Sequence, residues 1–195
     1  MLAYATLALS LTIRVYDTHG VALDTKAAAR AAVDRIVSPA GIHVIWAQCP
    51  CDDRVASTEL MIRITAAPAA ADPASLGFSY VDVEQRAGTL ATVFADRVHA
   101  LAQLAAVDEG ELLGRAMAHE IAHLLLGTRD HSAAGLLRGH WTSLELAKNQ
   151  PRDWQFSRGD GARLQQALAR RLRGPVAPAT AIARRDLNDA SVNAP

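Results

Sequence analysis

The hydrophobic pattern of the first third of the chain changes from strand to helix periodicity and back. Apolar residues at every second position of 9–15 predict a β-strand. An Ala-rich stretch with apolar residues at helical spacing follows and predicts a helix capped by Asp24 or Thr25. Two short apolar, β-branched runs at 42–46 and 60–64 then predict two more strands.

A strand pair and several helices follow. The runs 76–83 and 89–94 are separated by a polar turn and predict two paired strands. A helix is expected at about 109–126, because Asp108 precedes it as a capping residue and Gly127 suits a left-handed C-terminal cap. Other helices are expected at 95–107, 143–149 and 161–173. This order predicts an α+β domain with a twisted mixed sheet and a small helical C-terminal part.

The length of 195 residues, half of them hydrophobic, fits one domain. We expect that domain to cover residues 1–173. Residues 174–195 are rich in Ala, Pro, Asn and Asp without a usable period, so we expect a disordered tail there. The apolar segment 1–11 has no preceding Lys or Arg and no convincing cleavage site, so it gives no clear signal peptide.

The charge, hydrophobicity and cysteine content of the chain exclude some classes of function. The chain has 20 basic and 20 acidic residues, so it lacks the basic field of a general nucleic-acid binder. Its apolar runs are far shorter than the roughly 20 residues that cross a bilayer. We therefore expect no nucleic-acid partner, no membrane partner and a monomer. The only cysteines, Cys49 and Cys51, are too close in sequence for a relaxed mutual disulfide, and we expect them to pack in a loop.

The most informative residues form the pattern HEIAH inside the helix expected at 109–126. Residues four apart face the same way on a helix, so His119 and His123 can bind one cation. Glu120 lies about 100° round the axis, where it can meet a water on that cation without being a ligand. The helix around the pattern is mostly apolar, so these three polar groups would be costly to bury without a partner. Neutral imidazole favours Zn²⁺, and the pattern therefore predicts a zinc site.

A catalytic zinc normally takes three protein ligands and a water, so a third ligand is needed. His131 is the first candidate, because the chain can turn at Gly127 and bring an imidazole back under the helix. Asp130 is a competing ligand, or it orients a ligating histidine from behind. Glu145, on the next short helix, is the third candidate. His140 is close enough in sequence to help stabilise an oxyanion.

The segment 119–141, HEIAHLLLGTRDHSAAGLLRGHW, resembles the site of the metzincin zinc peptidases. Their motif H-E-x-x-H-x-x-G-x-x-H is followed by a turn that carries a Met beneath the metal. The segment resembles even more closely a group of small bacterial proteins with HExxHLLLG, then His-Ser, then Gly-(Leu/Ile)-Met-Arg and a Trp. The resemblance implies zinc ligands His119, His123 and His131, the general base Glu120, and Gly135, Leu136 and Leu137 as the counterpart of the Met-turn.

The chain departs from the metzincin pattern in two places. His131 stands eight residues after His123, where the pattern has six, and Leu137 replaces the Met. The resemblance otherwise implies a zincin-like fold, a metal loop at 127–141, and a secreted or periplasmic protein that acts on a peptide or protein substrate. In zincins an edge strand pairs with the substrate backbone, and 89–94 is our candidate for that strand.

Three hypotheses follow. The leading one is a zinc-dependent metallopeptidase, an endopeptidase, in which Glu120 activates water. The second is a zinc-binding domain without catalytic activity. The third is a gluzincin-like hydrolase that uses Glu145 as its third zinc ligand.

Overall fold

The structure is a computed structural model that describes residues 9–48 and 56–174. Cys49, Cys51, the segment 1–8 and almost all of the expected tail at 174–195 lie outside the described residues, so the expectations for them stay predictions.

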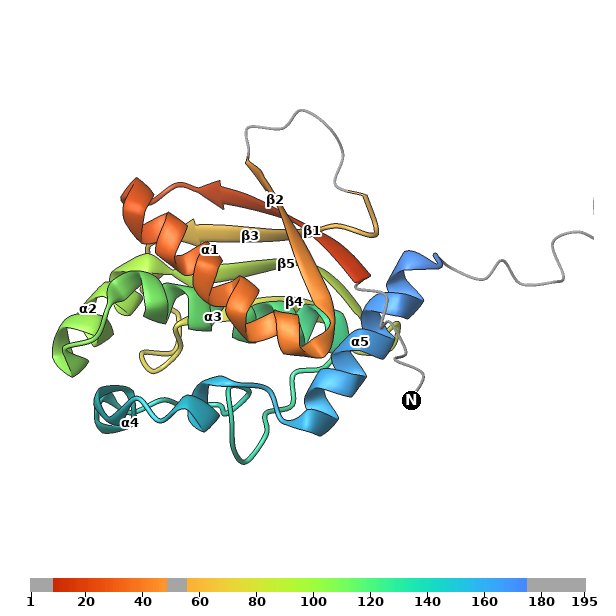
Figure 1. Ribbon diagram of the computed structural model, residues 1–195. Coiled ribbons are helices and arrows are strands. Elements are labelled where there is room, and N and C mark those ends of the chain that lie inside the picture. Colours follow the sequence, from red (N-terminus) through yellow and green to blue (C-terminus); the bar gives the residue numbers. More distant parts are fainter. Residues whose placement is uncertain (1–8, 49–55, 175–195) are drawn as a thin grey trace, which may run out of the picture.

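A five-stranded mixed sheet forms the upper layer of the molecule in Figure 1. Its strand order is β2-β1-β3-β5-β4, in which β4 pairs antiparallel with β5 and the other neighbours are parallel. Side chains alternate between buried and half-buried along β3, as expected when one face of a sheet packs on helices. The strands are β1 Leu9–Asp17, β2 Ile42–Gln48, β3 Leu60–Thr65, β4 Gly77–Asp82 and β5 Ala87–Phe94.

The expected pairing of the last two strands is confirmed, but the expected edge strand is wrong. β5, which contains 89–94, lies between β3 and β4, and its backbone is paired on both sides. β4 is the edge strand instead. The sequence could not show this, because the position of β5 depends on its pairing with β3, more than 20 residues away along the chain.

Three helices lie beneath the sheet in Figure 1. α3 begins after Asp108, whose carboxylate accepts a hydrogen bond from the Glu111 amide at 2.7 Å, and it ends at Gly127 with φ 62°. Both ends of this helix are therefore as predicted. α1 begins slightly earlier than expected, after Ala22, and neither Asp24 nor Thr25 caps it. The helices are α1 Leu23–Val37, α2 Ala95–Ala105 and α3 Glu109–Leu126.

The C-terminal part is helical, as expected, and α5 is fixed across the end of the sheet. The Arg171 guanidinium donates to the carbonyl of Gly88 at 2.8 Å and to that of Glu59 at 3.1 Å. These bonds hold the last turns of α5 beside the β4–β5 turn. No helix among the described residues is long and apolar enough to cross a bilayer. The elements of this part are α4 Ser143–Lys148 and α5 Arg158–Leu172.

Candidate metal centre

The site is built on α3, which is buried on nearly all sides. Apart from Glu109, Glu111 and Leu126, every residue of the helix is buried. Gly127 is required at its end, because a side chain there would collide with the backbone of Arg86 in the β4–β5 turn. Polar side chains inside such a helix need partners, since burying an unpaired polar group is costly.

His119 and His123 have partners for only one ring nitrogen each. The Nδ1 of His119 lies 2.9 Å from the carbonyl oxygen of Leu136, and the Nδ1 of His123 lies 2.9 Å from that of Thr128. A carbonyl can only accept, so both Nδ1 atoms carry the proton and donate. In the neutral rings, each Nε2 is therefore a bare acceptor.

These two bare nitrogens face each other at 3.0 Å. Two acceptors cannot hydrogen-bond, so their approach is unfavourable unless a cation binds both. Two imidazoles on a tetrahedral zinc have their nitrogens about 3.3 Å apart, given bonds of about 2.0–2.1 Å. Both side chains are nearly buried, with exposed fractions of 8% for His119 and 5% for His123. The pair thus fits a metal ion of the size and chemistry of zinc.

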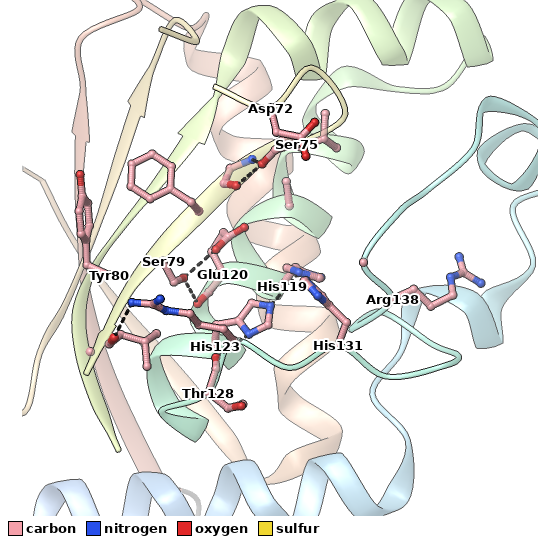
Figure 2. Close-up of a pocket in the computed structure, with 18 of the residues that line it drawn as sticks. Asp72, Ser75, Ser79, Tyr80, His119, Glu120, His123, Thr128, His131 and Arg138 are labelled. Atoms are coloured by element: carbon pink, nitrogen blue, oxygen red, sulfur yellow. Dashed lines mark hydrogen bonds between the residues drawn. The ribbon is translucent and has the colours of Figure 1, made fainter. Parts of the chain in front are cut away.

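His131 completes a three-histidine cluster (Figure 2). One ring nitrogen from each of the three histidines lies within 4.8 Å of the corresponding nitrogens of the other two. The His131 side chain is exposed on its outer side, and its ring lies against Gly139, where an added Cβ would come within 3.3 Å of the His131 Cγ. The structure therefore brings together the three histidines that the sequence singled out.

The surroundings keep these imidazoles neutral, which is the form that binds metal. Burial, followed by the charge of neighbouring His123, lowers the pKa of His119 to about 4. Burial also lowers the pKa of His123. Partial burial, followed by the charge of nearby His140, lowers the pKa of His131. Near neutral pH, protons compete little with a cation for this cluster.

Glu120 lies beside the cluster, against the edge strand. Its carboxylate Oε2 accepts a hydrogen bond of 2.7 Å from the Ser79 hydroxyl (Figure 2). Only 7% of Glu120 is exposed, and this burial raises the pKa of its carboxyl to about 7 although the Ser79 bond lowers it. A Cβ added to Gly77 would come within 3.2 Å of Glu120 Oε1. A group with such a pKa can both take up and release a proton near neutral pH.

A cavity of about 1180 Å³ opens over the cluster. β4 forms one wall, from Gly77 to Asp82, and the three histidines and Glu120 lie on another. His140 and Trp141 also line it. The cavity is large enough for several residues of a peptide.

The other candidate ligands lie outside the histidine cluster. Asp130 accepts a hydrogen bond from the Thr128 hydroxyl at 2.8 Å, and it therefore supports the residue whose carbonyl orients His123. Glu145 caps α4 through the amide and hydroxyl of Thr142, at 2.9 and 2.8 Å, which fully occupies its carboxylate Oε2. Its other oxygen lies 3.6 Å from Arg138, so a role as metal ligand is not favoured.

The groups that orient the site carry no recognisable signal in the sequence. Ser79 and Gly77 come from a strand with no motif, and the orienting oxygens of Thr128 and Leu136 belong to the main chain, where side-chain patterns carry no information. The ring of Trp141 lies edge-on to His119, with the two ring centroids 5.7 Å apart.

Comparisons with known proteins bear on the fold. No family model matches the chain, and no curated protein matches it in sequence. Among solved structures, the chain is similar to archaemetzincin from Methanopyrus kandleri, at 14% sequence identity and a TM-score of 0.53. The similarity covers 88% of this chain and 99% of the other. This α+β chain, with its mixed sheet and its helical C-terminal part, therefore shares the fold of archaemetzincin.

Proposed function

We propose that this protein is a zinc-dependent metallopeptidase. His119, His123 and His131 would hold the zinc, and Glu120 would be the general base. The observation that carries the proposal is the pair of bare, buried Nε2 atoms 3.0 Å apart, with a third imidazole beside them. The chain shares its fold with archaemetzincin, a protein named as a metzincin, and this shared fold supports the same proposal.

The side chains around the cluster suit peptide hydrolysis. Zinc bound by three imidazoles supplies a Lewis acid that polarises a carbonyl and makes a water more acidic. Oε1 of Glu120 accepts no hydrogen bond from the described residues, while Ser79 holds Oε2. Oε1 can therefore take a proton from the attacking water, and the protonated carboxyl can pass it to the leaving amine. His140 lines the same cavity and is our candidate donor to the oxyanion.

The edge strand β4 is the proposed docking site for the substrate. One side of its backbone pairs with β5. The other side faces the cavity and can add an extended peptide beside Ser79, while farther along the strand the Val81 carbonyl accepts a hydrogen bond from Arg129 at 3.3 Å. Ser79 contacts Glu120 near the middle of β4, so a peptide paired with this strand would extend past the general base in both directions. This arrangement favours an endopeptidase acting on a peptide or protein substrate.

Metal removal tests the proposal. Zinc-loaded protein is expected to cleave members of a mixed peptide library, detected by mass spectrometry. Chelation should reduce cleavage to the uncatalysed background, and zinc should restore it. Zinc bound at one equivalent without cleavage of any peptide would instead support the zinc-binding domain without catalytic activity. Protein that binds no zinc would contradict both.

Ser79→Ala tests how Glu120 is positioned. Loss of the bond to the carboxylate is expected to lower kcat about ten- to a hundredfold, because a hydrogen bond to a charged group contributes about 1.5–3 kcal/mol. KM and zinc content should stay unchanged, and Ser79→Thr, which keeps the hydroxyl, should retain most of the activity. Steady-state kinetics on one cleaved peptide gives both constants. A raised KM with an unchanged kcat would assign Ser79 to substrate binding instead.

A further inference from the structure

A second cavity, of about 580 Å³, lies beside the metal centre and is lined by four arginines. The chain as a whole is neutral, so this is a local concentration of positive charge. Asp130 is the only carboxylate among the lining residues, and it accepts a hydrogen bond from Thr128. We call this cavity the arginine pocket, and its arginines are Arg86, Arg129, Arg163 and Arg170.

Three separate parts of the fold bring these arginines together. Arg86 belongs to the β4–β5 turn, which packs on the end of α3 at Gly127. Arg129 lies two residues after Gly127, in the loop that follows α3, and donates to the Val81 carbonyl at 3.3 Å. α5 contributes the other two arginines from one face, seven residues apart, and Arg171 fixes this helix beside the turn. The cluster is therefore held by the tertiary structure.

The guanidinium groups keep capacity to bind an anion. Arg163 contacts Asp160 at 3.3 Å through one nitrogen, and Arg129 donates one bond to a carbonyl. A guanidinium has five N–H donors, so these contacts leave most of them available. The planar arrangement of these donors matches a carboxylate.

The arginine pocket is continuous with the cavity over the metal centre. Thr128 and Arg129 line both. β4 also leads from the cavity over the metal centre to the arginine pocket. Ser79, on the strand, contacts Glu120 at the metal centre. Val83, which comes just after the strand, lines the arginine pocket. Four residues of extended chain span about 13 Å. A peptide that follows β4 from Ser79 would meet Arg129 first, at the Val81 carbonyl, and would reach the other arginines about four residues from the bond that is cleaved.

We infer that the arginine pocket binds acidic side chains of a peptide held along β4, and so selects substrates with Asp or Glu about four residues from the scissile bond. This inference rests on the proposed function, because a scissile bond exists only if the protein is a peptidase. Binding of an acidic peptide to the pocket, however, requires no hydrolysis and can be measured by itself. The ligand is a carboxylate on a peptide, because the pocket continues from a strand edge that can pair with a peptide backbone.

Binding to the zinc-loaded Glu120→Gln variant tests the inference. The affinities of two fluorescent peptides are compared, one with a Glu-Glu pair and the other with a Gln-Gln pair at the same position. The comparison is repeated with the pair placed at successive positions along the peptide. The Glu-Glu peptide is expected to bind about tenfold more tightly at one window of positions, the size expected for two or three partly exposed ion pairs. The difference should shrink as salt is added.

Charge variants made in the same background assign the effect to the pocket. Arg163→Gln with Arg170→Gln should abolish the preference, and Arg163→Glu with Arg170→Glu should reverse it toward a Lys-Lys peptide. The matched control is Arg152→Gln with Arg158→Gln, two exposed arginines outside the pocket lining, which should keep the preference. Thermal melting of each variant checks that it is folded.

Several results would overturn the inference. Equal affinity for the two peptides at every position would exclude acidic selection, and a preference that survives Arg163→Gln with Arg170→Gln would place it elsewhere. Competition by inorganic phosphate as strong as by the acidic peptide would indicate a small-anion site. Tighter binding of a single-stranded oligonucleotide at the same arginines would indicate a nucleic-acid site. Failure of the proposed function is measured separately, as absence of cleavage by zinc-loaded wild-type protein.

Discussion

Glu120→Gln is expected to lower kcat for peptide hydrolysis by about a hundred- to ten-thousandfold, the range measured for loss of a general base. The amide has nearly the same shape as the carboxyl but cannot take a proton from water. Ser79 can still donate to the amide oxygen, so the side chain should keep its position against β4. Steady-state cleavage of one peptide, with zinc content measured on the same sample, checks this result.

Stability provides a second measurement on the same variant. The Glu120 carboxyl is almost fully buried, and its raised pKa reflects the cost of ionising it there. A neutral Gln avoids that cost, so the melting temperature of Glu120→Gln should equal or exceed that of wild type. Glu109→Gln is the matched control, because Glu109 is in the first turn of the same helix and pairs with His99 at 2.6 Å on the surface. Equal activity of Glu120→Gln and wild type would exclude Glu120 as the base.

His131→Ala is expected to weaken zinc binding by more than about a hundredfold and to abolish hydrolysis. Loss of an outer-shell partner alone costs about ten- to a hundredfold in metal affinity, and loss of a ligand costs more. Two histidines from α3 would remain, which is too few for a catalytic zinc. Competition with a chromophoric chelator gives the affinity of each variant.

Two substitutions separate His131 from the alternative ligands. Glu145→Ala should retain zinc, because the Glu145 carboxylate is occupied in capping α4. Asp130→Ala should lower the affinity only slightly, through loss of its bond to Thr128. Zinc release by Glu145→Ala together with retention by His131→Ala would instead support the gluzincin-like ligand set.

Features of the fold that depend on residues close together in sequence could be predicted from the sequence. The ends of α3 were predictable because Asp108 and Gly127 act within one turn of the helix. His119 and His123 were predictable as a pair because helical geometry alone places them on one side. The proximity of His131 depends on the path of a loop, so helical geometry alone could not predict it.

Features that depend on contacts between residues far apart in sequence could not be predicted from the sequence. Nothing local distinguishes β4 from β5, so the choice of 89–94 as edge strand was wrong, and with it the residues that face Glu120 were missed. Ser79 reaches Glu120 only because β4 is antiparallel to β5 and lies along α3. The arginine pocket likewise combines a turn, a loop and α5, which are up to 84 residues apart in sequence, and charge counts along the chain could not reveal it.

The two carbonyl bonds to α3 also determine how the segment 128–136 behaves. His123 holds Thr128 at its start and His119 holds Leu136 at its end, so the helix closes this segment into a ring that contains His131. The entropy of ring closure is then lost when the protein folds, before any ion arrives. Metal binding by this ring would therefore resemble the chelate effect of a macrocycle, and changes that open the ring would weaken metal affinity even where no ligand is altered.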